Sequence, residues 1–260
     1  MSVNMPKLLA LDFDGVICDG LLEYFATTKK TYQQIWTPYK QEFDANLAPK
    51  FYRLRPVIET GWEMPVLLRA LILAIPEAEI LADWSAVATK IITTEKLDKH
   101  LLAQTLDGVR DNWINTDLDS WLALHRFYPG VISRLQQVVE ADTQLYIVTT
   151  KEGRFVKQLL QQQGIELSTE CIIGKESKRP KYETLRLLRD SIEGNKSEIW
   201  FVEDRIKALQ QVQQQPDLTM VRLFLADWGY NLKGDRALAD RDPNLQLLSL
   251  ERFGQEFRVW

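Results

Sequence analysis

Two aspartates near the start of the chain lie close enough in sequence to bind one cation together. Asp12 and Asp14 are separated by one residue and follow the apolar run Leu8–Leu11. Such a short run is typical of a strand buried on both faces, and Gly15 allows the sharp turn after it. Two carboxylates this close repel each other unless a cation neutralises them, and Mg2+ prefers oxygen ligands. The structural alternative is a strand that simply ends in a polar turn.

Other polar residues follow later apolar runs in the same way. They are Thr149, Lys178, Lys181, Glu203 and Asp204. The carboxyl ends of parallel strands meet at one edge of an open sheet, so these side chains are expected to converge. One carboxylate could then attack phosphorus while a second handles the proton of the leaving group. A metal ion and a lysine would neutralise the phosphoryl oxygens.

Each of these residues also has a purely structural interpretation. Thr149 and Glu152 have the spacing of a capping box at a helix start, which is the better interpretation of that pair alone. Each lysine could lie in a solvated turn. Glu203 and Asp204 could lie in the first turn of a following helix, where the helix dipole stabilises acidic side chains. Their joint occurrence, at successive strand ends and in this order, favours the functional interpretation.

The apolar patterns predict an α/β fold with a doubly wound parallel sheet, because strands alternate with helices. Strands are expected at 8–11, 145–148, 171–174, 199–202, 220–225 and 245–248. The block 21–123 interrupts this alternation with helical spacing and predicts four to six helices. The expected organisation is a Rossmann-like core of residues 1–19 and 124–260, with an inserted all-helical cap of residues 20–123.

Composition limits the classes of partner. The net charge is −4 and the sequence has no basic block, which argues against nucleic acid as a partner. No apolar run has the length of a membrane span or the form of a signal peptide, so a cytoplasmic protein is expected. Cys18 and Cys171 are too few for a disulfide framework. The sequence does not indicate an oligomeric state.

The ordered set of motifs resembles the haloacid dehalogenase-like hydrolase superfamily. Its first motif corresponds to Asp12-Phe13-Asp14. The resemblance implies that Asp12 is the nucleophile and that Asp14 is the general acid/base. It also implies a Mg2+ cofactor bound by the Asp12 side chain and the Asp14 backbone carbonyl.

The resemblance extends to the later motifs. It implies that Thr149 donates a hydrogen bond to the phosphoryl group. It also implies that Asp204 is a metal ligand, with Glu203 in support. The motif lysine is either Lys178, which fits one family spacing, or Lys181 at the expected helix start, which fits the other and is slightly favoured.

Two further stretches, Tyr128-Pro129-Gly130-Val131 and Trp228-Gly229-Tyr230, resemble the phosphoglycolate-phosphatase-like branch, which has a helical C1-type cap. The implied function is a Mg2+-dependent phosphatase that hydrolyses a small phosphorylated metabolite through an aspartyl-phosphate intermediate. The cap is longer than expected for that branch, so the substrate stays open. Arg53, Arg55 and Lys90 are the candidate cap contacts for an anionic substrate.

Three other functions compete with the phosphatase. A phosphomutase would use the same residues but keep water away from the phospho-aspartate. A non-catalytic relative would act as a binding protein. A signalling receiver domain is disfavoured because its acidic pair precedes the phospho-acceptor strand, whereas Asp12 comes first here.

Overall fold

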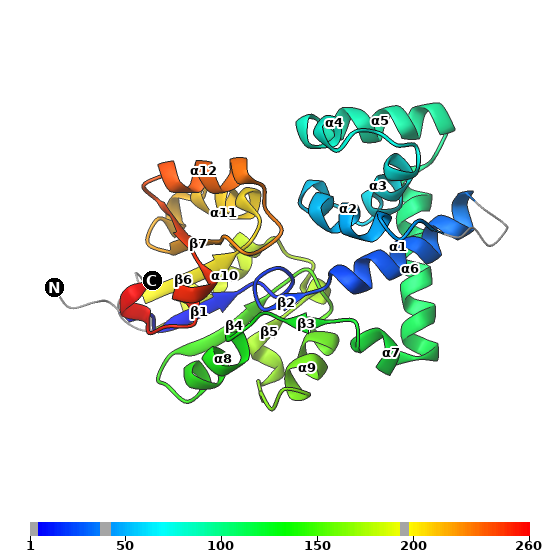
Figure 1. Cartoon of the computed structure of the whole chain (residues 1–260). Helices are drawn as coiled ribbons and strands as arrows, with labels where there is room; N and C mark the ends of the chain where they lie inside the picture. Colours follow the sequence, from blue (N-terminus) through cyan, green and yellow to red (C-terminus); the bar gives the residue numbers. More distant parts are fainter. Residues whose placement is uncertain (1–4, 37–42, 193–197) are drawn as a thin grey trace. The chain divides into compact units, whose positions relative to one another are not determined.

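A six-stranded parallel sheet forms the centre of one of two compact units in the computed structural model, which describes residues 5–36, 43–192 and 198–260 (Figure 1). The strands lie in the order β5 (Ile172–Ile173), β4 (Gln144–Val148), β1 (Leu8–Leu11), β6 (Ile199–Glu203), β7 (Arg222–Ala226) and β8 (Leu245–Leu248). The predicted doubly wound α/β fold is therefore confirmed. From β1 the chain builds first toward β5 and then returns to β6, so the strand order reverses beside β1. Open α/β sheets bind ligands at such a reversal.

The two units are a sheet unit, residues 1–19 and 126–260, and a helical unit, Gly20–His125. The cap expected at residues 20–123 lies within the helical unit. A separate two-stranded antiparallel sheet is formed by β2 (Cys18–Asp19) and β3 (Arg126–Phe127), and it pairs the two chain segments at the boundary of the sheet unit. The sequence did not predict this strand pair.

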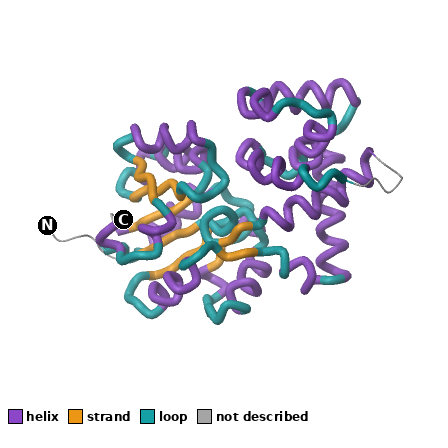
Figure 2. The backbone as a smooth tube through the Cα atoms, in the orientation of Figure 1, coloured by secondary structure: helices purple, strands orange, loops and turns teal. Residues whose placement is uncertain are grey.

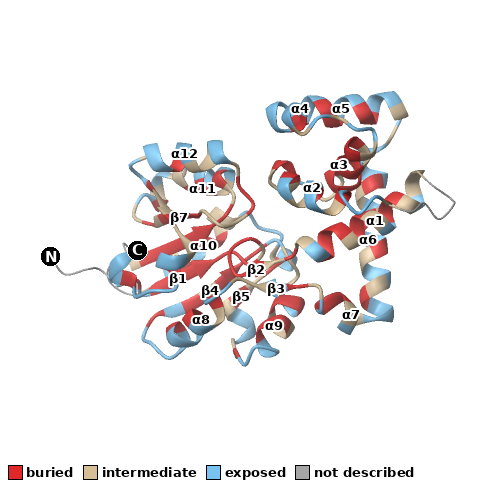
Figure 3. Cartoon of the chain, in the orientation of Figure 1, coloured by how far each residue is buried: buried red, intermediate tan, exposed pale blue. Residues whose placement is uncertain are grey.

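The central strands β1 and β6 are buried along their whole length, which explains their uninterrupted apolar sequences (Figure 3). Leu11 pairs with Ile147 of β4 on one side and with Val202 of β6 on the other. The backbone N–H of Asp12 donates to the carbonyl of Val202 at 2.9 Å. This register brings the residues that follow β1 and β6 to the same level at the sheet edge.

Helices cover both faces of the sheet, as Figures 1 and 2 show. They are α8 (Val131–Val139), α9 (Gly153–Gln161), α10 (Lys181–Ser191), α11 (Ile206–Gln213), α12 (Lys233–Arg241) and α13 (Leu250–Phe253). Buried apolar residues of α10, α11 and α12 pack with Leu8 and Ala10 of β1. Leu9 and Leu11 point to the opposite face because side chains alternate along a strand. Both faces of β1 are thus covered, and its carboxyl end is left for polar residues.

The described part of the helical unit contains seven α-helices, one more than the upper limit expected. They are α1 (Leu21–Trp36), α2 (Leu47–Leu54), α3 (Glu63–Ile72), α4 (Glu77–Ala82), α5 (Trp84–Glu95), α6 (Lys99–Thr116) and α7 (Leu118–Leu122). Two helices, α4 and α5, follow each other directly because Asp83 ends α4 and caps α5, accepting from the N–H of Ala86 at 2.9 Å. Residues 37–42 of the predicted helical block lie outside the described residues.

None of the described helices is both long enough and apolar enough to cross a bilayer.

Candidate active site

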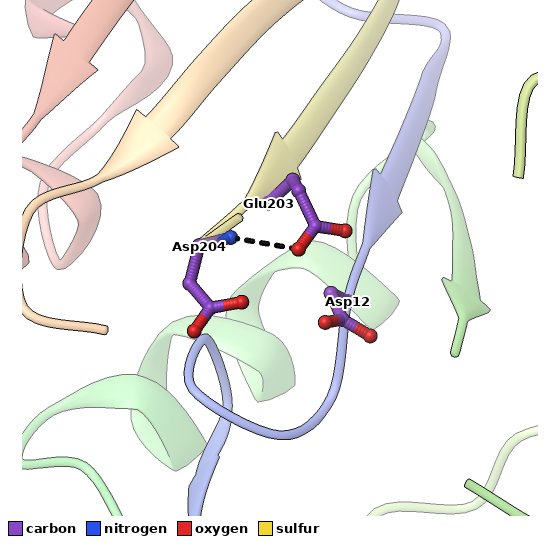
Figure 4. A group of neighbouring side chains, drawn as sticks. All are labelled: Asp12, Glu203 and Asp204. Carbon is purple, nitrogen blue, oxygen red and sulfur yellow. Dashed lines mark hydrogen bonds between the residues drawn. The ribbon is translucent and has the colours of Figure 1, made fainter. Parts of the chain in front are cut away.

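Three buried carboxylates meet where β1 and β6 end. One oxygen from each of Asp12, Glu203 and Asp204 lies within 4.8 Å of the others. Asp12 is 7% exposed and the other two residues are fully buried. Figure 4 shows the three side chains converging from the adjacent ends of the two strands. The strand register explains the convergence, since Glu203 ends β6 beside Asp12.

Lys181 neutralises part of this cluster. Its Nζ lies 2.8 Å from Asp12 Oδ1 and 2.6 Å from Glu203 Oε2. Lys181 is the first residue of α10, directly after Pro180, which fixes the start of the helix. Burial alone would lower the pKa of Lys181, but the two carboxylates outweigh burial and raise the pKa above its ordinary value.

The other candidate lysine, Lys178, lies elsewhere. It is exposed and has a left-handed backbone (φ 52°) at the end of the short 3-10 helix Lys175–Ser177. The structure therefore brings Lys181 to the carboxylates, and it does not bring Lys178 there.

Both oxygens of Glu203 already have protein partners. Oε1 accepts from the backbone N–H groups of Asp204 (3.1 Å) and Arg205 (3.0 Å), and Oε2 accepts from Lys181. The alternative that residues 203–204 are first-turn acids is wrong, because α11 starts only at Ile206. Glu203 thus orients Lys181, and its oxygens are less available to a cation than those of Asp204.

Asp204 has one oxygen bound by the protein and one that is not. Its Oδ2 accepts from the backbone N–H of Tyr230 at 2.6 Å. Its Oδ1 is buried and has no hydrogen-bond partner among the described residues. A buried anionic oxygen without a donor is costly. The donor set of Asp204 and Asp12, carboxylate oxygens only, fits a hard divalent cation such as Mg2+.

Burial disfavours the charged form of all three acids. It raises the pKa of Asp12 to about 7, with a further contribution from Glu203 and an opposing one from Lys181. Burial also raises the pKa values of Glu203 and Asp204. A cation bound between Asp12 and Asp204 would favour their ionised forms.

Asp14 lies outside the buried cluster. Its side chain is 18% exposed, and Lys151 Nζ lies 3.3 and 3.4 Å from its two oxygens. Sequence reasoning missed Lys151, although this residue comes only three positions after the end of β4. Including every charged residue near a strand end, rather than the first polar one, would have found it.

Thr149 is buried directly after β4, and its hydroxyl accepts from the backbone N–H of Lys151 at 3.1 Å. The capping-box interpretation is wrong, because α9 begins at Gly153 with Glu152 as its N-cap residue. The local turn at 149–151 places the hydroxyl at the sheet edge instead. Its contact with a phosphoryl group stays a prediction.

The three candidate residues of the helical unit differ in setting. Arg53 pairs with Glu77 at 2.7 Å on the surface. The guanidinium of Arg55 lies 4.8 Å from the centre of the Tyr24 ring. Lys90 lies on the exposed side of α5, in a depression lined with hydroxyl groups. Whether any of them contacts a substrate stays a prediction.

Comparisons with known proteins bear on the family and the fold of the chain. The sequence profile of the haloacid dehalogenase-like hydrolases matches residues 86–215, half of the chain. The match includes Thr149, Lys181 and the acidic pair, and it starts after Asp12 and Asp14. No curated protein matches the chain. The chain belongs to the haloacid dehalogenase-like hydrolase family.

Solved structures share the whole fold at low sequence identity. A predicted phosphatase from Clostridium acetobutylicum is 13% identical, with a TM-score of 0.60 over 96% of this chain and 97% of its own. A haloacid dehalogenase-like family hydrolase from Streptococcus pneumoniae is 13% identical, with a TM-score of 0.58 over 94% of each chain. A predicted phosphoglycolate phosphatase from Haemophilus somnus is 15% identical, with a TM-score of 0.56 over 99% of this chain and 97% of its own.

Proposed function

We propose that this protein is a Mg2+-dependent phosphatase that hydrolyses a small phosphorylated metabolite through a phospho-aspartate at Asp12. The observation that carries the proposal is the ion pair of 2.8 Å between Lys181 Nζ and Asp12 Oδ1, within the buried cluster that includes Asp204. A lysine held between a nucleophilic carboxylate and its neighbour is placed to neutralise charge that develops on a phosphoryl group.

Asp12 would attack phosphorus with a carboxylate oxygen and release the alcohol of the ester. Glu203, with both oxygens bonded within the protein, would keep Lys181 beside Asp12 during this step. Water would then attack the phosphorus of the phospho-aspartate, which restores Asp12 and releases inorganic phosphate.

Asp14 would supply a proton to the leaving oxygen and later take one from water. Its partial exposure supports this role, because a proton-transfer group must be accessible to substrate. Thr149 would donate a hydrogen bond from its hydroxyl group to a phosphoryl oxygen.

The side chains of Asp12 and Asp204 and the backbone carbonyl of Asp14 would hold the cation. When bound, Mg2+ would supply charge neutralisation for the phosphoryl oxygens. The unpartnered Oδ1 of Asp204 supports this assignment.

The class of substrate is supported by the names of structurally similar proteins, which include a predicted phosphatase and a predicted phosphoglycolate phosphatase. Candidate substrate contacts within the helical unit are Arg53, Arg55 and Lys90. Each is cationic, which suits contact with an anionic metabolite.

The test is release of inorganic phosphate from a panel of sugar phosphates, phosphoglycolate, nucleotides and phosphoamino acids, with Mg2+ and with excess chelator. We expect release from at least one ester, and only with the metal. Transfer of phosphate between positions of one substrate without release would identify a phosphomutase. Absence of either reaction would support a non-catalytic binding protein.

A further inference from the structure

The segment after β7, residues 229–231, surrounds Asp204. We propose that this segment holds the Asp204 carboxylate so that only one oxygen can bind a cation, which selects Mg2+ over Ca2+. The inference rests on the proposed metal site and assigns its cation selectivity to residues that do not themselves bind the metal.

The first observation is a backbone donor. The N–H of Tyr230 lies 2.6 Å from Asp204 Oδ2, so that oxygen is committed to the protein. Gly15 closes the same side: a Cβ at Gly15 would lie 2.1 Å from Oδ2. Oδ2 is therefore enclosed by backbone, while Oδ1 remains without a protein donor.

The second observation is the close approach of Gly229. A Cβ at this position would lie 2.3 Å from Asp204 Cβ and 2.5 Å from the carbonyl oxygen of Gly15. Only glycine lets the segment pass between Asp204 and the turn after β1. The carboxylate is thus packed on two sides by main chain, which restricts its rotation.

The third observation is the amide of Asn231, which is 5% exposed. Its Nδ2 donates to the carbonyls of Asp204 (3.1 Å) and Ala226 (2.7 Å). Its Oδ1 accepts from Arg236 Nη1 at 2.8 Å. The Asn231 amide therefore connects the backbone of Asp204 to the end of β7. Hydrogen bonds to both its nitrogen and its oxygen fix the orientation of this amide.

Tyr230 is anchored in turn by its side chain. Its hydroxyl donates to Asp19 Oδ1 at 2.9 Å, and its carbonyl accepts from Arg205 Nη1 at 2.9 Å. The residue is 5% exposed. These contacts hold the Tyr230 backbone N–H against Asp204 Oδ2.

The consequence follows from the preferences of the two cations. Mg2+ takes six ligands in a tight octahedron, whereas Ca2+ takes six to eight and often binds both oxygens of one carboxylate. A carboxylate that can offer only Oδ1 satisfies Mg2+ and denies Ca2+ its second oxygen. Loosening residues 229–231 should therefore weaken Mg2+ binding and leave Ca2+ binding less affected.

The experiment is titration calorimetry of Mg2+ and of Ca2+ with the full chain and two variants, Asn231→Ala and Tyr230→Phe. Loss of a residue that orients a metal ligand commonly weakens metal binding about 10- to 100-fold. We expect about tenfold weaker Mg2+ binding or more in Asn231→Ala, a smaller loss in Tyr230→Phe, and a lower Mg2+/Ca2+ affinity ratio in both. Tyr230→Phe keeps the backbone donor, so it remains informative if Asn231→Ala does not fold.

Tyr146→Phe on β4 is the matched control and should leave both affinities at their wild-type values. Variants that keep the wild-type affinity ratio would overturn the selectivity proposal, whether both affinities are unchanged or fall equally. A wild-type protein that binds neither cation would instead refute the metal dependence in the proposed function, so the two failures are distinguishable.

Discussion

At the scale of single residues, the two lysines before and at the start of α10 differ in their surroundings. Lys181 pairs with two buried carboxylates, whereas Lys178 is exposed. We expect Lys181→Ala to lower kcat about a hundredfold or more, as removal of one preorganised charge donor does. Lys178→Ala should change kcat/KM little. Steady-state phosphate release measures both, and the reverse order of defects would contradict the assignment of Lys181.

The sequence indicated the candidate lysines but could not decide firmly between them, because both spacings occur in the family. The decision depends on where α10 starts relative to Asp12, which is a tertiary property. The contact of Lys151 with Asp14 was missed for a related reason. A lysine three residues after a strand is usually solvated, and only the turn at 149–151 directs this one inward.

Competition between protons and Mg2+ at Asp12 gives a second prediction at this scale. Because burial raises the pKa of Asp12 from 3.8 to about 7, the native protein without metal retains a proton that the unfolded chain loses. This group's contribution to the free energy of unfolding is therefore present below pH 4 and is lost as pH rises toward 7. Glu203 and Asp204 act in the same direction.

Since Mg2+ replaces that proton, the rise in Tm on adding Mg2+ should be small at pH 5 and larger at pH 8. Thermal unfolding at both pH values, with Mg2+ and with chelator, measures this difference. In Asp12→Asn the pH dependence of the metal-free Tm should decrease. A Mg2+ shift that is equal at both pH values would exclude Asp12 as a ligand that titrates.

At the scale of elements, position 15 in the turn after β1 should tolerate no side chain. Gly15 has φ 89°, and a Cβ there would meet Asp204 Oδ2 at 2.1 Å. Gly15→Ala should abolish Mg2+ binding and also destabilise the fold by about 1–3 kcal/mol through backbone strain. Calorimetry with Mg2+ and urea unfolding measure the two effects.

Gly130 is the matched control, because it has a similar φ of 78° but no neighbour within 4 Å of an added Cβ. Gly130→Ala should lower the free energy of unfolding through the same backbone strain and leave Mg2+ binding unchanged. Equal losses of Mg2+ binding in the two variants would show that strain, and not contact with Asp204, is the cause.

All six strands of the sheet could be predicted because each is a short apolar run after a turn or helix. The pairing of β2 with β3 could not, since each strand has only two residues and pairs with a partner more than a hundred residues away. Helix α12 was also missed. Its sequence is mostly polar and only Ala239 is buried, so it carries no apolar period.

At the scale of the whole molecule, each unit has its own stabilising network. In the helical unit Glu23 of α1 is fully buried and accepts from Arg110 of α6 at 2.8 Å and from Trp121 of α7 at 3.0 Å. Glu23→Gln would leave the Arg110 charge largely buried without its partner. We expect the free energy of unfolding of the helical unit to fall by about 3 kcal/mol. This is the lower end of the usual cost of breaking a buried ion pair, because Arg110 is partly exposed.

Hydrogen exchange should therefore increase in α1, α6 and α7, while Mg2+ affinity in the sheet unit stays the same. Glu77→Gln, which breaks the exposed pair with Arg53, is the control and should change exchange little. A loss of Mg2+ affinity in Glu23→Gln would contradict the view that the metal site is built by the sheet unit alone. The sequence predicted the helical block, but not this network, because the three residues are far apart in the chain.

The central claim is that Asp12 carries the phosphoryl group, and the most direct measurement is chemical trapping of that intermediate. The protein would be mixed with Mg2+ and an ester that it hydrolyses, quenched rapidly and treated with borohydride, which reduces an aspartyl phosphate to homoserine. We expect mass spectrometry to find homoserine at position 12, with Asp14 unmodified and no product in Asp12→Asn. Turnover by Asp12→Asn near the wild-type rate, or trapping at a different residue, would contradict the account.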